Sequence, residues 1–279
     1  MKQTISVVIP CYNEEKALGK CLTAIADQTR KPDEVIVVDN NSQDKTVEIA
    51  KQFSFVKIVQ ERRQGLYYSR QTGMAHAKGD VICRVDADTV LDSHWIERVE
   101  ELFADPSTQA ASGPMGYHDF LLPEVARQIE HGFLLGARAL RYHFLFGCNM
   151  AIRQSAWRQV QAELCSDPKV LEDIDIAMHL KAHGLKIVYD RGLSAMVSIR
   201  RAEDNPVQFT SYISGHSYTL RKHGVPTVGG RYAEASFLLG YLAFKPILMA
   251  YDTDRRRLSR SKLLYGAAKR PNPMSASSK

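Results

Sequence analysis

Residues 4–104 alternate short β-branched runs with segments of helical periodicity, and this alternation constrains the fold more than any other feature. Strands that alternate with helices build a parallel sheet whose faces are covered by those helices. The pattern therefore predicts an α/β protein with a Rossmann-like, mainly parallel central sheet flanked by helices. The expected strands are 4–10, 34–39, 55–60 and 81–85, and the expected helices are 14–28, 44–53, 67–78 and 93–104.

Beyond residue 105 the regular alternation stops. The pattern there predicts a largely helical stretch at 121–146, a turn at 147–153 that leads into a short helix, a helix at 172–183 and a strand at 186–189. An apolar run at 235–251 comes before a basic tail. We therefore expect three segments, 1–112, 113–225 and 226–279, the last being a helical C-terminal extension.

The net charge of +6 belongs to the C-terminal tail, because residues 252–279 hold eight basic and two acidic side chains. The neutral body argues against a nucleic-acid-binding protein. The five cysteines are scattered, and neither they nor the histidines show the spacing of a zinc site, which favours reduced thiols in the cytoplasm. The first apolar run is shorter than a signal-peptide core and stops at Pro10, so it predicts a strand.

Polar and acidic residues follow three of the predicted strands, at 10–15 (PCYNEE), 39–42 (DNNS) and 86–88 (DAD). Open parallel sheets bind ligands beyond the carboxyl ends of their strands. No glycine-rich phosphate-binding loop follows the first strand, so another group must neutralise phosphate charge. Asp86 and Asp88 offer two hard oxygen ligands for Mg²⁺ or Mn²⁺, which in turn binds diphosphate oxygens. The alternative is an acidic loop that caps the helix near Ser93.

The tripeptide D-x-D is weak evidence alone, since it also occurs at 173–175 and 252–254. Several motifs in order are more specific. They are 7–14 (VVIPCYNE), 38–42 (VDNNS), 65–70 (GLYYSR) with Gly73, 86–88 (DAD), 147–153 (GCNMAIR) and 171–173 (LED). Through these motifs the chain resembles a non-processive family 2 glycosyltransferase of the GT-A fold over about residues 4–190.

The resemblance implies a nucleotide-sugar-binding half at 1–112 and an acceptor-binding, catalytic half at 113–225. A flat base needs an aromatic wall and an edge acceptor, and a diphosphate needs cations. Each residue also has a structural alternative, such as packing for Tyr12, a helix-start carboxylate for Glu14 and a turn cap for Asp39. The implied nucleotide-binding residues are Pro10, Tyr12, Glu14, Asp39, Arg70 and Asp86, and the implied metal ligands are Asp86 and Asp88.

The resemblance also places a general base at Asp173, which would take the proton of the acceptor hydroxyl. It puts Asn149 and Glu172 in the acceptor or donor-sugar pocket. The alternative for the acids at 172, 173 and 175 is that they only favour a helix start. Arg200, Arg201 and His216 are further candidates to approach the diphosphate or the metal, although a lone histidine is more often structural.

The implied activity is inverting, metal-dependent transfer of a single sugar from a nucleoside-diphosphate sugar, by default a UDP-sugar. The hydroxyl acceptor would be lipid-linked or a cell-surface glycan precursor. The Q-x-x-R-W stretch of processive synthases does not follow the Glu172–Asp173 pair, which favours a single addition. The alternatives are a sugar nucleotidyltransferase and a nucleotide-sugar-binding protein without turnover.

The apolar run at 235–251 has 17 residues and is interrupted by Lys245 and Pro246, so it is shorter than the ~20 residues that cross a bilayer. Beside the basic residues of the tail, it favours peripheral contact with an anionic membrane through 235–270. The alternative is a helix packed on the domain's own core. We expect a cytoplasmic protein that associates with the inner face of the membrane.

Overall fold

The computed structural model of the chain describes residues 2–121, isolated positions between 123 and 142, residues 145–252 and residues 257–258. Most of the predicted helical stretch at 121–146 and most of the basic tail therefore lie outside the described residues.

The centre of the protein is a seven-stranded sheet with the order β3-β2-β1-β4-β8-β6-β9. The four strands from β3 to β4 are parallel, and β6 and β9 are parallel to each other. Strand β8 runs antiparallel to both of its neighbours, β4 and β6. The strands are β1 (Ile5–Cys11), β2 (Glu34–Asp39), β3 (Val56–Gln60), β4 (Val81–Arg84), β6 (Thr108–Ser112), β8 (Met150–Arg153) and β9 (Lys186–Tyr189).

Helices cover both faces of this sheet, and successive residues of β1 point into two different cores. Val8 packs in the core that also contains Met74 of α3, whereas Val7 packs in the core with Trp95 of α4. Burial on both faces explains why the strands are continuous apolar runs. Helices α3 (Leu66–His76), α6 (Gln154–Val160) and α7 (Glu172–Ala182) line one face, and α1 (Leu18–Ala26), α2 (Thr46–Ala50) and α4 (Trp95–Ala104) line the other.

The close packing of α3 on the sheet depends on Gly73. A Cβ atom at this position would lie 2.3 Å from Val8 Cγ1 and 2.9 Å from Val38 Cγ2. Any larger residue would push the helix away from β1 and β2, and with it the Arg70 side chain that the same helix carries.

The sheet confirms the predicted fold class, but two strands differ from the prediction. Residues 150–153 form β8 at the centre of the sheet, where the sequence predicted a turn into a helix, and β6 was not predicted. Both strands are short: β6 (TQAAS) has few apolar residues, and the four residues of β8 (MAIR) are too few to show a period. The helix predicted after the turn does follow, as α6.

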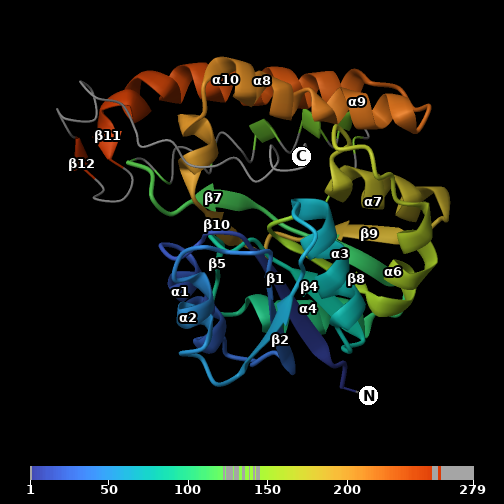
Figure 1. Ribbon diagram of the computed structural model, residues 1–279. Helices are drawn as coiled ribbons and strands as arrows, with labels where there is room; N and C mark the ends of the chain where they lie inside the picture. Colours follow the sequence, from blue (N-terminus) through green and yellow to red (C-terminus); the bar gives the residue numbers. More distant parts are fainter. Residues whose placement is uncertain are drawn as a thin grey trace.

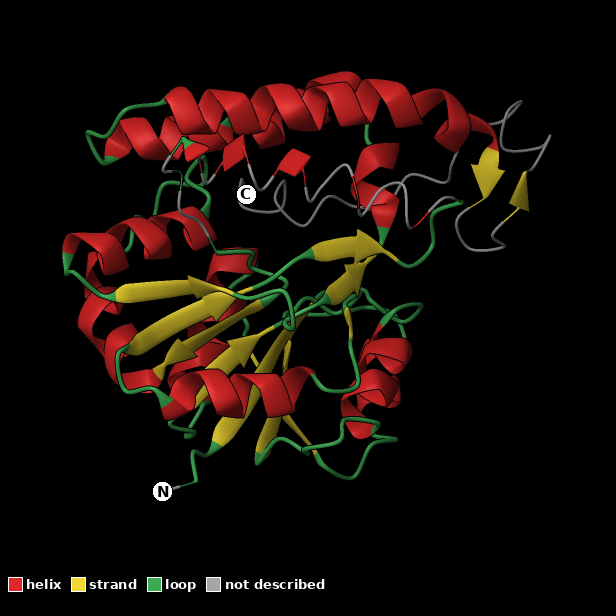
Figure 2. Cartoon of the chain, turned by 180° about the vertical axis from the view of Figure 1, so that it is seen from behind, coloured by secondary structure: helices red, strands yellow, loops and turns green. Residues whose placement is uncertain are grey.

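A second layer lies above the carboxyl edge of the sheet (Figure 1). It begins with a small sheet in the order β5-β10-β7 and continues into short and long helices. The long helix α10 crosses the top of the molecule in the reverse view as well (Figure 2). The elements of this layer are β5 (Val90–Leu91), β7 (Met115–Tyr117), β10 (Ala195–Val197), η2 (Ile199–Glu203), α8 (Pro206–Ile213), α9 (Gly215–Lys222), α10 (Val228–Ala250), β11 (Tyr251–Asp252) and β12 (Arg257–Leu258). The short helix η1 (Gln161–Glu163) instead directly follows α6.

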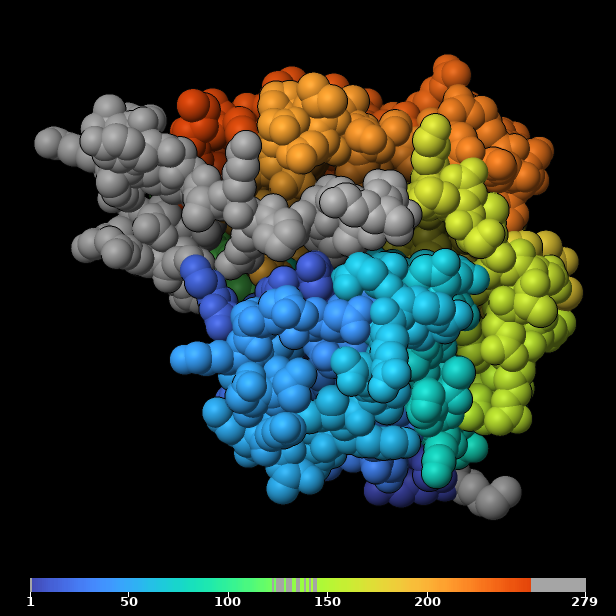
Figure 3. Space-filling view, in the orientation of Figure 1, coloured from blue at the N-terminus to red at the C-terminus, as the bar shows by residue number. Residues whose placement is uncertain are grey.

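Helix α10 packs on η2, α8 and α9 rather than standing apart. Tyr241 stacks on Phe209 of α8 with ring centroids 4.2 Å apart. Lys245 donates to three backbone carbonyls at the end of η2, of which the Asp204 carbonyl is 2.7 Å away. The space-filling view shows the C-terminal helices, in orange, above the N-terminal half, in blue and cyan (Figure 3).

Candidate active site

Asparagine side chains tie together the loops that follow β1 and β2. Asn13 and Asn41 adopt left-handed backbone conformations, with φ angles of 55° and 64°. The Asn13 N–H donates to Ser42 Oγ at 3.1 Å, and Asn13 Oδ1 accepts from the Gln43 N–H at 2.8 Å. Asparagine tolerates this conformation better than most residues do. The two loops therefore form one connected surface at the carboxyl edge of the sheet.

Three residues predicted to bind the base lie at this edge. Pro10 is buried in β1 opposite Val38, and Tyr12 is half-buried in the loop that follows. Asp39 is buried at the end of β2, where its Oδ1 accepts from the Ser42 N–H at 3.1 Å. Asp39 thus caps a turn in this structure, and contact with a base remains a prediction for all three residues.

Arg200 of η2 bridges Glu14 and Asp88, two predicted site residues that follow the strands β1 and β4. Its guanidinium donates to Glu14 Oε2 at 2.8 Å and to Asp88 Oδ2 at 2.5 Å. Burial lowers the pKa of Arg200, but the charges of Asp88 and Glu14 raise it above its ordinary value. We call Glu14, Asp88 and Arg200 the Arg200 triad.

The donor set at the end of β4 fits a divalent cation. Asp86 and Asp88 supply carboxylate oxygens, which are the preferred ligands of Mg²⁺ and also suit Mn²⁺. The Asp86 side chain is 37% exposed, and Arg70 Nη2 lies 3.7 Å from its Oδ1. In the Arg200 triad a guanidinium places positive charge against Asp88, where a metal ion would place it. Arg200 contacts Oδ2 of Asp88 and thus competes with a metal ion for that oxygen.

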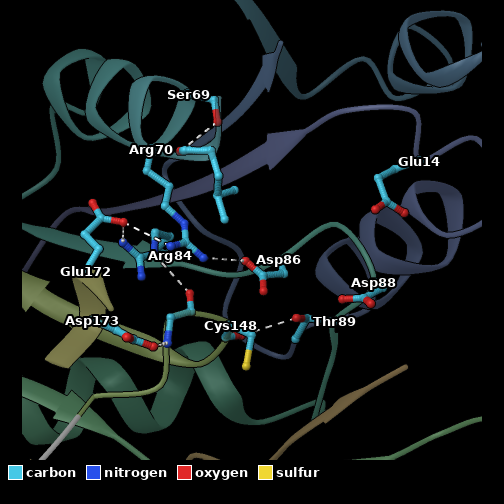
Figure 4. Close-up of polar contacts among 12 residues, drawn as sticks. Glu14, Ser69, Arg70, Arg84, Asp86, Asp88, Thr89, Cys148, Glu172 and Asp173 are labelled. Carbon is cyan, nitrogen blue, oxygen red and sulfur yellow. Dashed lines mark hydrogen bonds and ion pairs between the residues drawn. The ribbon is translucent and has the colours of Figure 1, made fainter. Parts of the chain in front are cut away.

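A second cluster of charged residues connects α3, β4 and α7 (Figure 4). Glu172 Oε2 accepts from Arg70 Nη1 and from Arg84 Nη1, each at 3.1 Å. Arg84 is fully buried, and Glu172 is 9% exposed. Burial and the neighbouring charge of Arg70 lower the pKa of Arg84. We call Arg70, Arg84 and Glu172 the buried arginine cluster.

Asp173 lies at the start of α7, directly beside this cluster. Its Oδ2 accepts from the Gly147 N–H and its Oδ1 from the Ile174 N–H, each at 3.0 Å. A Cβ atom at Gly147 would be 2.4 Å from Arg84 Nη2, 3.3 Å from Asp173 Oδ2 and 3.4 Å from Arg70 Nη2. Glycine is therefore required where these three charged side chains converge.

Arg70 lies between Asp86 and Glu172. Asp86 is a predicted metal ligand, and Glu172 is the neighbour of the predicted base, Asp173. Burial lowers the pKa of Arg70, but the nearby charges of Glu172 and Asp86 raise it above its ordinary value. The structure thus brings Asp86 and Asp173 close to the same arginine. The strand ends predicted the place of Asp86, whereas the place of Asp173 was implied by the family resemblance.

Two residues predicted to line a sugar pocket have structural contacts instead. Asn149 is fully buried, and its side chain donates to the carbonyls of Pro114 and Leu193 and accepts from Trp95 Nε1. Every polar atom of Asn149 therefore binds protein, which differs from the predicted place in a pocket. The Glu172 carboxylate is likewise held by the guanidinium groups of Arg70 and Arg84.

The three further candidates to approach the diphosphate or the metal, Arg200, Arg201 and His216, differ in their contacts. Arg201 lies 4.2 Å from the ring centroid of Tyr212, which places it in a cation–π contact. His216 is buried, its Nδ1 lies 2.8 Å from the Tyr142 hydroxyl, and burial lowers its pKa to about 4. Among the contacts of the described residues, Arg200 is the candidate that reaches predicted site residues, Glu14 and Asp88.

Comparison with known proteins assigns this arrangement to a family. The sequence pattern of the family described as Glycosyl transferase family 2 matches residues 6–160, which are more than half of the chain. The chain belongs to glycosyl transferase family 2. It is a family 2 glycosyltransferase with a GT-A-like fold.

Curated relatives match this glycosyltransferase over a limited region. Glycosyltransferase AglE of Haloferax volcanii is 41% identical over 101 residues, which cover 34% of this chain and 33% of that protein. Glycosyltransferase GlyG of Streptococcus pneumoniae is 36% identical over 114 residues, which cover 38% of each chain. The matched region thus spans little more than a third of either relative.

Solved structures extend the likeness to the whole fold. The mannosyltransferase PcManGT of Pyrobaculum calidifontis, in complex with GDP-Man and Mn²⁺, has a TM-score of 0.65 and 19% identity, covering 99% of this chain and 78% of that one. TarS 1-349 of S. aureus, in complex with UDP-GlcNAc, has a TM-score of 0.57 and 16% identity, covering 88% and 74%. At such identities the glycosyltransferase shares a fold with them, and its substrates need their own evidence.

Sequence reasoning missed Arg84 as part of the site of this glycosyltransferase. Arg84 occupies a strand whose other residues are apolar, Val81, Ile82 and Cys83. A charged side chain inside a buried strand is rare unless it is paired, so this position was itself a signal of a buried partner.

Proposed function

We propose that the protein transfers a single sugar from a UDP-sugar to a hydroxyl acceptor with inversion at the anomeric carbon. The observation that carries this proposal is the bridge made by Arg70 between Asp86 and the residue next to Asp173. A metal-bound diphosphate and an acceptor hydroxyl need to lie on opposite sides of the transferred sugar. Carboxylates on the two sides of one arginine provide such an arrangement.

In this proposal each residue has a defined task. Asp173 accepts the proton of the attacking hydroxyl, while Arg70 neutralises charge that develops on the departing diphosphate. Asp86 and Asp88 hold Mn²⁺ or Mg²⁺, and when bound the metal supplies Lewis-acid stabilisation of the leaving group. Glu172 positions Arg70 without touching the substrate. The acceptor that we propose is a lipid-linked or cell-surface glycan precursor.

The proposal predicts that donor binding depends on a metal held by Asp88. For the wild-type chain, a matching nucleotide sugar at 100 times its Kd with Mn²⁺ should raise Tm by about 5 °C, because a ligand specific for the folded state stabilises it by ~2.7 kcal/mol. Asp88→Asn should lose this shift. Thermal unfolding with a panel of UDP- and GDP-sugars, with and without Mn²⁺, measures both effects and shows which nucleotide the donor carries.

Asp92→Asn is the matched control, since Asp92 follows in the same segment and its Oδ1 only accepts from the His94 N–H at 3.1 Å. This variant should keep the metal-dependent shift. An equal shift in chelator-treated wild-type protein, or in Asp88→Asn, would contradict the metal-dependent mechanism.

We also propose that α10 rests on an anionic membrane surface. The helix has 23 residues, so it is longer than the apolar run in the sequence and is long enough, by length and composition, to cross a membrane. Its inner face, however, packs on η2, α8 and α9. Its exposed positions between 235 and 249 are all apolar: Ala235, Leu239, Leu242, Ala243, Pro246 and Met249.

We call these six residues the apolar stripe, and they favour an interfacial position over a spanning one. Leu239 is 68% exposed and Leu242 is 59% exposed, which is unusual for neighbouring leucines on one helix. The basic tail that follows in the sequence would add attraction to anionic lipid of about 1 kcal/mol for each charge near the surface.

Replacing both leucines with glutamate should abolish sedimentation with vesicles that contain anionic phosphatidylglycerol. The double variant places negative charges where the wild type places apolar area against the interface. Val207→Glu is the control, because Val207 is 79% exposed on α8, outside the apolar stripe. Unchanged binding of the Leu239→Glu, Leu242→Glu variant would overturn the membrane proposal.

A further inference from the structure

Three metal-ligating side chains converge between α7 and the end of α9. His223 Nε2 lies 2.6 Å from Asp175 Oδ1, and His179 Nε2 lies 3.5 Å from the same oxygen. The three ligand atoms all lie within 4.8 Å of one another. Asp175 and His179 are one helical turn apart on α7, whereas His223 directly follows α9.

Surrounding groups hold these side chains in place. The Cys165 N–H donates to Asp175 Oδ2 at 2.8 Å, so the other carboxylate oxygen is directed towards the histidines. His179 Nδ1 lies 3.1 Å from Glu163 Oε2 in η1. A carboxylate on the far nitrogen of a histidine is the usual partner of a metal-binding imidazole, because it fixes the tautomer and the ring orientation.

The distance between His179 and Asp175 suits a shared cation. His179 Nε2 lies 3.5 Å from Asp175 Oδ1, which is longer than a usual hydrogen bond. Zn²⁺ with ligands at about 2.0–2.2 Å in tetrahedral geometry separates neighbouring ligands by roughly that distance. His223 Nε2 is hydrogen-bonded to the same oxygen at 2.6 Å, so its side chain would shift outward to ligate the cation.

We propose that Asp175, His179 and His223 form a structural Zn²⁺ site. Two imidazoles and one carboxylate suit Zn²⁺ better than Mg²⁺, which prefers oxygen ligands alone. This site is separate from the carboxylates of β4 that hold the donor metal, and it does not depend on the proposed transferase mechanism. The sequence analysis expected no zinc site because His223 is distant in the chain from the other two ligands.

The position of the site gives it a mechanical role. Helix α7 begins with Glu172 and Asp173, and Asp175 follows within the same first turn. Zn²⁺ bound by Asp175 and His223 would link this turn to the end of α9. The helix that carries the predicted base would thus be restrained by a ligand two residues away, which fixes the direction of the Asp173 carboxylate.

Zinc binding to the full chain, freed of metal by chelator and titrated in a calorimeter, tests the proposal. The wild type should bind one Zn²⁺ per chain, and His223→Gln and His179→Gln should each weaken that binding by about 100-fold or more. His183→Gln is the matched control, because His183 also contacts Glu163, at 2.7 Å, but is not one of the three ligands. It should bind zinc as the wild type does.

Asp88→Asn should also keep the zinc affinity, and this separates the new site from the donor-metal site. If a histidine variant does not fold, Co²⁺ titration of the wild type still decides, since a tetrahedral site gives intense visible absorption bands that Zn²⁺ then abolishes. Equal zinc affinity of wild type and a folded His223→Gln variant would overturn the proposal, as would weak octahedral Co²⁺ bands.

Discussion

Asp173→Asn is expected to lower turnover by about 10²–10⁴-fold while donor affinity stays close to that of the wild type, because a positioned general base contributes this much to rate. The amide has the size of the carboxylate but cannot accept the acceptor's proton at neutral pH. Turnover is measured as nucleoside diphosphate released in the presence of a hydroxyl acceptor from a screen of lipid-linked and soluble glycans. Donor affinity is measured by calorimetry with Mn²⁺.

The substitution also has a structural cost that must be separated from the chemical one. Both Asp173 oxygens accept backbone N–H bonds, and asparagine keeps only one acceptor oxygen. Loss of one such bond costs about 1 kcal/mol of folding free energy, which lowers Tm but leaves most molecules folded. Folded protein is therefore quantified before rates are compared.

Asp167→Asn is the control for the loss of an acid near α7. Asp167 lies in the loop before the helix, where it accepts from the Tyr218 hydroxyl at 2.6 Å and from the Lys169 N–H at 3.0 Å. This variant should turn over at the wild-type rate. Wild-type turnover by Asp173→Asn itself would mean that another group takes the proton.

The N-terminal half could be predicted from sequence because its elements follow local rules. The predicted strand at 34–39 coincides with β2, whose apolar run is buried on both faces. The predicted helix at 14–28 is longer than α1, which begins at Leu18. Residue 14 lies instead in the preceding loop, where its side chain pairs with Arg200. Helix boundaries are the part of an element that local periodicity determines least well.

The location of the site could be predicted, but its charge pairing could not. The sheet topology alone brings the strand ends at Asp39 and Asp86 to one edge. By contrast, Arg200 is 186 positions from Glu14, and Arg84 is 88 positions from Glu172. Pairing at such separations depends on the complete fold, and so does the burial of Asn149.

Glu172→Gln is expected to destabilise the fold by about 3–5 kcal/mol, because it leaves the buried Arg84 without its carboxylate partner. Burial alone disfavours this charge, and its pKa is already lowered. Arg84 Nη2 is buried and, within the described part of the chain, has no hydrogen-bond partner that could compensate. Thermal unfolding should show a decrease in Tm of about 10 °C or more.

The same substitution should weaken donor binding, since Glu172 also holds Arg70 towards Asp86. Glu101→Gln is the control: it removes a partner of Arg98 that is 57% exposed, and it should leave Tm nearly unchanged.

A double-mutant cycle with Arg84→Met separates a buried ion pair from simple loss of packing. When both charges of the pair are removed, the fully buried Arg84 charge no longer remains unpaired, so the double variant should be more stable than the sum of the two single losses predicts. Its donor affinity should nevertheless stay low, because Arg70 still lacks the carboxylate that positions it. Additive stability losses would mean that Glu172 and Arg84 contribute independently. Wild-type donor affinity in the double variant would mean that Arg70 reaches Asp86 without the help of Glu172.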